Sequence, residues 1–137
     1  VAVDGLLSGL GGAVVMAAYL WVGGIVSGLA PGTLFDHLTG ETPSTLTQLL
    51  THLAVGAVYG ALFALAYRLV RRLWKSGPLW PVAGAYGVLL WLAAEILLLP
   101  GTGSPLPTVA QAHFAVAHLL YGLVLGLLLT RTGFGSE

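Results

Sequence analysis

Four ionisable side chains lie inside long apolar runs of this sequence, where a charge is costly and a functional role is the default hypothesis. They are His52, Glu95, His113 and His118. Imidazoles can ligate a haem iron or a metal ion, and His and Glu side chains can both carry protons near neutral pH. These four side chains are therefore the first candidates for chemistry.

Residue spacing places two of the histidines on helix faces that also carry glycine, because residues four apart share one face of a helix. Two such stripes combine a histidine with two glycines: His52, Gly56 and Gly60, and His118, Gly122 and Gly126. His113 is five residues from His118, about 140° around a helix, so a small site is not expected to use both of them.

Three interpretations of these groups remain open. In the first, two imidazoles from parallel helices are axial ligands of a haem or another tetrapyrrole, with His52 paired to His118 or to His113. In the second, Glu95 combines with His52 and His118 to hold a metal ion or to relay protons. In the third, the groups lie within a turn or two of water, or bond across helices, and have a structural role.

The elements that position these residues are four apolar stretches, each long enough to cross a bilayer as a helix of about 20 residues. The chain is 57% hydrophobic and 7% charged, far from the roughly 25% charged residues of soluble domains. We expect an all-α protein with a single transmembrane domain over residues 1–137. Its four spans should form a compact up-down bundle and cover about residues 5–29, 45–67, 79–99 and 108–130.

The basic residues all lie on the same side of the membrane in this predicted arrangement of four spans. Arg68, Arg71, Arg72 and Lys75 lie between the second and third stretches, and Arg131 follows the fourth. Because Lys and Arg gather in cytoplasmic loops, both termini are predicted to be cytoplasmic. The first four residues of this set are also candidates to contact anionic lipid or an acidic partner. The first stretch is too long for a signal peptide and is expected to be retained as a span.

Pairs of glycines four residues apart mark faces where helix backbones can approach closely. Thr51–Gly60 resembles Ala112–Gly122 with a one-residue shift, which suggests a duplicated 2+2 hairpin arrangement. Close packing, within the bundle or against a partner helix, is expected at Gly5/Gly9, Gly24/Gly28, Gly56/Gly60 and Gly122/Gly126.

Several classes of function find no support in the sequence. The chain has no cysteine, which excludes disulfides, thiolate metal sites and cysteine nucleophiles. No Gly-x-Ser-x-Gly motif is present, and Gly101–Ser104 lacks the lysine of a phosphate-binding loop. The formal net charge is zero, so the composition does not indicate the excess of basic residues that is typical of nucleic-acid-binding proteins. We therefore expect a protein that is not an enzyme.

The runs Thr51–Tyr67 and Ala117–Gly126 resemble the pattern of small four-helix bacterial inner-membrane proteins of unknown function, among them the YagU-like group. The resemblance implies a fold and a location, and it transfers no catalytic residues. Our leading hypothesis is a small non-catalytic accessory subunit of a larger bacterial membrane complex, respiratory or photosynthetic. It would contact the bilayer and other membrane subunits, or associate with itself. The alternatives are a haem-binding electron-transfer protein and a proton- or metal-linked transport protein.

Overall fold

A computed structural model describes residues 1–28, 44–73, 78–98 and 108–133 of the chain. In this part the protein consists of four long helices, α1 (Ala2–Val26), α3 (Thr45–Leu73), α4 (Leu79–Ala93) and α6 (Thr108–Arg131), and a π-helical turn, η1 (Ala94–Leu98), that continues α4. Each α-helix, with η1 added to α4, is long and apolar enough to cross a membrane. The expected helical membrane bundle is confirmed.

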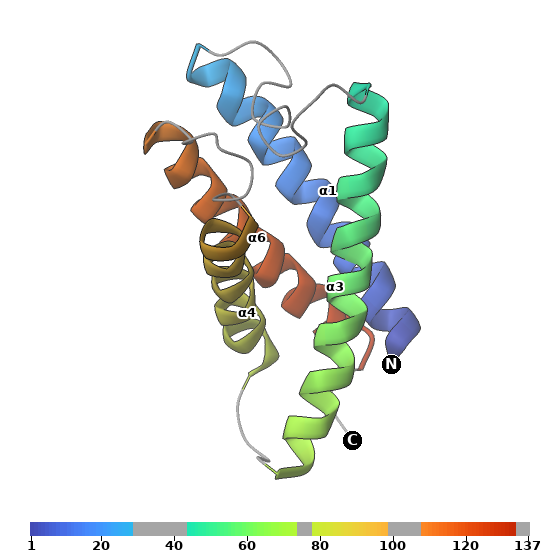
Figure 1. Cartoon of the computed structure of the whole chain (residues 1–137). Helices are drawn as coiled ribbons and strands as arrows, with labels where there is room; N and C mark the ends of the chain where they lie inside the picture. Colours follow the sequence, from blue (N-terminus) through green and yellow to red (C-terminus); the bar gives the residue numbers. More distant parts are fainter. Residues whose placement is uncertain (29–43, 74–77, 99–107, 134–137) are drawn as a thin grey trace.

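The helices alternate in direction (Figure 1). The start of α1, the end of α3, the start of α4 and the end of α6 lie at the lower end in that view. Contacts join α1 to α3, α4 to α6, and α1 to α6. The bundle therefore consists of two hairpins, α1/α3 and α4/α6, that meet mainly where α1 packs on α6.

Helix boundaries follow local chemistry. The Ser44 hydroxyl accepts a hydrogen bond from the Thr47 backbone N–H at 3.3 Å, so Ser44 is the N-cap of α3. At the other end α3 extends six residues beyond the predicted boundary at Tyr67, and Arg68 and Arg71 lie on its last turns. Straight-chain basic residues are good helix formers, which is why the helix continues through them.

Glycine sets the distance between helices within each hairpin. A Cβ atom added to Gly9 of α1 would lie 2.5 Å from the carbonyl oxygen of Gly56 and 2.8 Å from the Cα of Gly60. In the other hairpin, a Cβ on Gly122 of α6 would lie 3.0 Å from the Cα of Gly84. The backbones thus meet in both hairpins at a glycine that follows a tyrosine, Gly60 or Gly122, as a duplicated arrangement predicts.

The buried core lies where the two hairpins meet, and small residues alternate there with larger ones. Alanines leave room for the rings and leucines of neighbouring helices, which gives dense packing. Its buried members include Ala13, Met16, Ala17, Leu20, Phe63, Ala64, Tyr67, Ala83, Phe114, Ala117, Tyr121, Leu125 and Leu129. Large apolar side chains also cover the outside, as expected of a surface that faces lipid.

Candidate functional site

His113 connects α6 to the last turns of α1. Its Nδ1 lies 3.0 Å from the hydroxyl of Tyr19, and its Nε2 lies 3.0 Å from the hydroxyl of Ser27. Tyr19, Gly23 and Ser27 are four apart on α1, and Gly23 leaves space for the imidazole, because a Cβ there would lie 3.2 Å from Nδ1. Both ring nitrogens of His113 therefore serve the contact between α1 and α6.

His52, on α3, makes a different contact with α1. Its Nε2 lies 3.2 Å from the carbonyl oxygen of Ala13, so this nitrogen carries the proton and donates. In the neutral ring Nδ1 is then the acceptor nitrogen. The side chain is half-buried, one turn before the point where Gly56 contacts α1.

His118, on α6, donates from Nδ1 to the carbonyl of Phe114 in its own helix, at 2.8 Å. Its Nε2 is therefore the acceptor nitrogen of the neutral ring. His118 lies close enough to His52 for the two rings to interact electrostatically. The two pairs that the sequence suggested as tetrapyrrole ligands, His52 with His118 and His52 with His113, stay predictions.

Two tyrosines link α3 to the second hairpin. The Tyr121 hydroxyl of α6 donates to the Gly56 carbonyl at 2.6 Å, and the Tyr86 hydroxyl of α4 donates to the Tyr59 carbonyl at 3.1 Å. The rings of Tyr86 and Phe63 pack with their centroids 4.9 Å apart. Sequence analysis did not assign these tyrosines a role, although the adjacent glycines mark close helix contacts.

Glu95 lies in η1, at the end of α4. Its Oε1 accepts a hydrogen bond from the indole N–H of Trp91 at 3.2 Å, and both side chains are half-buried. The described residues contain no group of three or more His, Asp or Glu side chains that could hold a metal ion. The predicted combination of Glu95 with His52 and His118 is thus not brought together as a metal site in this part of the chain.

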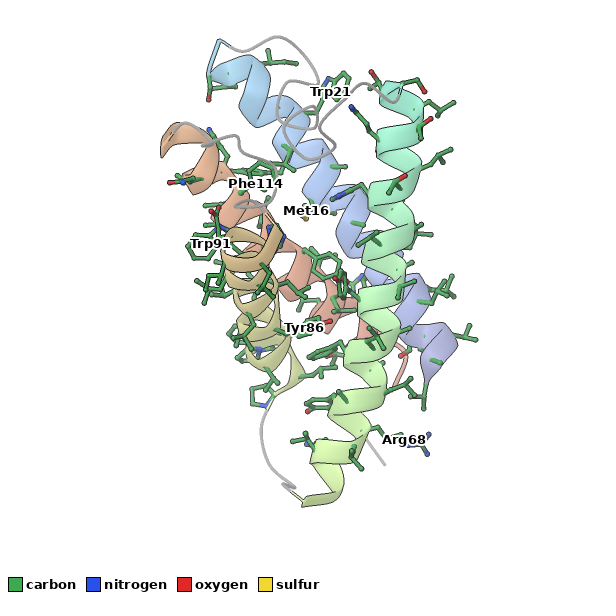
Figure 2. The ribbon with its side chains drawn as sticks, viewed as in Figure 1. Met16, Trp21, Arg68, Tyr86, Trp91 and Phe114 are labelled. Atoms are coloured by element: carbon green, nitrogen blue, oxygen red, sulfur yellow. The ribbon has the colours of Figure 1, made fainter. Side chains whose placement is uncertain are left out.

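The described basic residues lie where the helices end. Arg68 is exposed near the lower end of α3 (Figure 2), Arg131 is exposed at the end of α6, and the guanidinium of Arg71 lies 5.9 Å from the centre of the Tyr67 ring. Lys75 and the side chain of Arg72 lie outside the described residues. Contact of this basic region with lipid or a partner remains a prediction.

The predicted glycine pairs have different roles. The pairs Gly5/Gly9, Gly56/Gly60 and Gly122/Gly126 all meet a neighbouring helix. Gly24 is buried, but Gly28 ends α1 with φ at 73° and has nothing within 4 Å of its Cβ position. Gly28 therefore terminates the helix, because its left-handed backbone conformation suits glycine.

Comparison with protein-family models, with curated proteins and with solved structures finds no match to this chain. The resemblance to the YagU-like group therefore stays a prediction.

Proposed function

We propose that this protein is a small structural subunit of a larger membrane assembly, in which the bundle acts as a rigid packing element. The observation that carries this proposal is the use made of the embedded histidines. His113 bonds to Tyr19 and Ser27, His52 to the Ala13 carbonyl, and His118 to its own helix. The bonds of His113 and His52 join different helices, and the bond of His118 fixes its imidazole on α6.

Glycine contacts support the same role. Backbones that meet without intervening side chains give short, well-defined helix separations, and van der Waals packing is the main attraction between helices in lipid. Gly9 meets Gly60 in one hairpin, and Gly84 meets Gly122 in the other. A bundle fixed in this way presents a constant outer surface, which suits a subunit that positions other helices.

The surface offered to a partner is on α4. This helix packs on α6, and its buried residues, Leu79, Ala83, Gly84 and Gly87, are confined to that side. Tyr86 contacts α3, and the side of α4 that faces away from both helices is apolar, with Leu89 62% exposed. We assign the outward face of α4 as the contact surface for a neighbouring subunit.

Purification of the tagged protein from its native membranes tests the proposal. In a mild detergent the wild-type chain should elute with at least one other membrane protein, at a mass well above that of the bundle. Ala85→Trp, on the outward side of α4, should release that partner, whereas Val14→Trp on the exposed face of α1 should retain it. Elution of the wild-type protein as an isolated bundle contradicts the proposal.

A haem-binding electron-transfer protein is the second candidate, in which His52 and His118, which interact electrostatically, would be the axial ligands. The acceptor nitrogens of these rings are the groups that would coordinate the iron. Absorption spectra of the protein purified from cells supplied with haem precursors test this function. A Soret band that is lost in His118→Ala and kept in His113→Ala supports it, and the lack of such a band in the wild-type protein contradicts it.

A further inference from the structure

Glu95 is a carboxyl group that lies within the membrane span formed by α4 and η1. It lies roughly 24 Å along α4 from Leu79, at 1.5 Å per residue. It therefore lies within the span Leu79–Leu97, near the end that is opposite to Leu79. An ionised carboxyl at this depth needs a compensating group.

The described part of the chain supplies Glu95 with one hydrogen-bond donor, the indole of Trp91. The described basic side chains are far away, since Arg68 and Arg71 lie on the last turns of α3 and Arg131 ends α6. Figure 2 shows Arg68 near the lower end of α3 and Trp91 near the upper end of α4. These cations are thus at the opposite end of α4 from Glu95.

The residues around Glu95 are directed away from the bundle. Ile96 is 67% exposed and Leu97 is 74% exposed, and Leu92 is exposed one turn earlier. The π-helical turn Ala94–Leu98 shifts these residues out of the register of α4, a feature often found at functional positions of helices. The half-buried carboxyl is therefore bordered by an apolar surface that another helix can cover.

We propose that Glu95 forms a charge pair with a Lys or Arg side chain in a transmembrane helix of a different protein, which packs against Leu92, Ile96 and Leu97. This inference rests on the proposed function and specifies the chemistry of the partner. A carboxylate and a cation that meet within the membrane neutralise each other and remove two costly charges from lipid. A second, parallel copy of this chain does not fit, because its described cations lie at the other end.

Photocrosslinking in native membranes tests the pair. A benzophenone amino acid at Ile96 should crosslink to a membrane protein that carries Lys or Arg within an apolar span, whereas the same probe at Val14 on α1 should not capture that protein. Glu95→Gln, which keeps the size of the side chain, should lower the crosslink yield at Ile96 and the co-purified partner by about tenfold or more. Glu95→Lys combined with Lys→Glu or Arg→Glu in the partner should restore both.

The possible outcomes separate this inference from the proposed function. If the wild-type chain captures and co-purifies no partner, both are wrong. If Glu95→Gln retains the partner at the wild-type level, or if the protein captured at Ile96 has no cation within its spans, the charge pair is wrong and the structural role stands. Capture of a second copy of this chain likewise overturns the charge pair. Thermal unfolding of Glu95→Gln in detergent, expected at the wild-type temperature, shows that the variant folds.

Discussion

The hydroxyl of Tyr121 on α6 donates a 2.6 Å hydrogen bond to the backbone carbonyl of Gly56 on α3, across the interior of the bundle. This bond joins the two hairpins at a buried position, since Tyr121 is 3% exposed. The bond adds to the van der Waals packing that holds the helices together.

Tyr121→Phe should lower the free energy of unfolding by about 0.5–1.5 kcal/mol, because it removes one buried hydrogen bond and keeps the ring. Unfolding in mixed detergent micelles, followed by circular dichroism, measures the change. Tyr59→Phe is the matched control, since this ring is 38% exposed on the outside of α3. Equal effects of the two substitutions would show that the Tyr121 bond does not stabilise the bundle.

Gly9→Ala should destabilise the α1/α3 hairpin by about 1–3 kcal/mol. The new methyl group would meet the Gly56 carbonyl oxygen at 2.5 Å, and neither backbone can move without separating the helices. Gly11→Ala makes the same change on the same helix, but there the nearest atom, at 2.6 Å, is the flexible end of Leu128. The same unfolding assay should show a clearly smaller effect for Gly11→Ala, and the reverse order would contradict the glycine-packing argument.

The bond between His113 and Ser27 predicts a positive coupling energy in a double-mutant cycle. His113→Leu and Ser27→Ala each remove the 3.0 Å contact, so the double variant should be more stable than the sum of the single effects implies. Coupling of about 0.6 kcal/mol is expected, the average for polar pairs between membrane helices. His113→Leu with Thr130→Ala, at the other end of α6, should be additive, and zero coupling for His113 with Ser27 would contradict the contact.

Sequence patterns predicted the features of this fold that are local to one helix. Long apolar runs predicted the four spans, and the N-cap of α3 was narrowed to Ser44 or Thr45, since both features depend on neighbouring residues. Spacing also placed Gly56 and Gly60 on one packing face. The predicted ends of the spans agree with the helix bounds to within three residues, except that the end of the second span, predicted at Tyr67, was six residues too early.

The sequence did not predict which side chains of different helices contact each other. Tyr19 and Ser27 are 94 and 86 residues from His113, and no periodicity within α6 indicates which helix will face that imidazole. The π-helical turn at Glu95 could not be predicted either, because amino-acid composition does not distinguish a π-helical turn from an α-helical one. Spacing shows on which face a polar group lies, while its protonation and its bonding depend on the neighbouring helix.

Orientation in the membrane gives the last prediction, and the absence of cysteine makes it simple to test. Because Arg68, Arg71 and Arg131 lie at one end of the bundle, that end is expected to be cytoplasmic. In intact cells an impermeant maleimide should label Thr45→Cys, at the opposite end, and should label Thr132→Cys only after permeabilisation. Leu125→Cys, fully buried in the core, should stay unlabelled in both conditions. Labelling of Thr132→Cys in intact cells would reverse the orientation and would place the carboxyl of Glu95 on the cytoplasmic side.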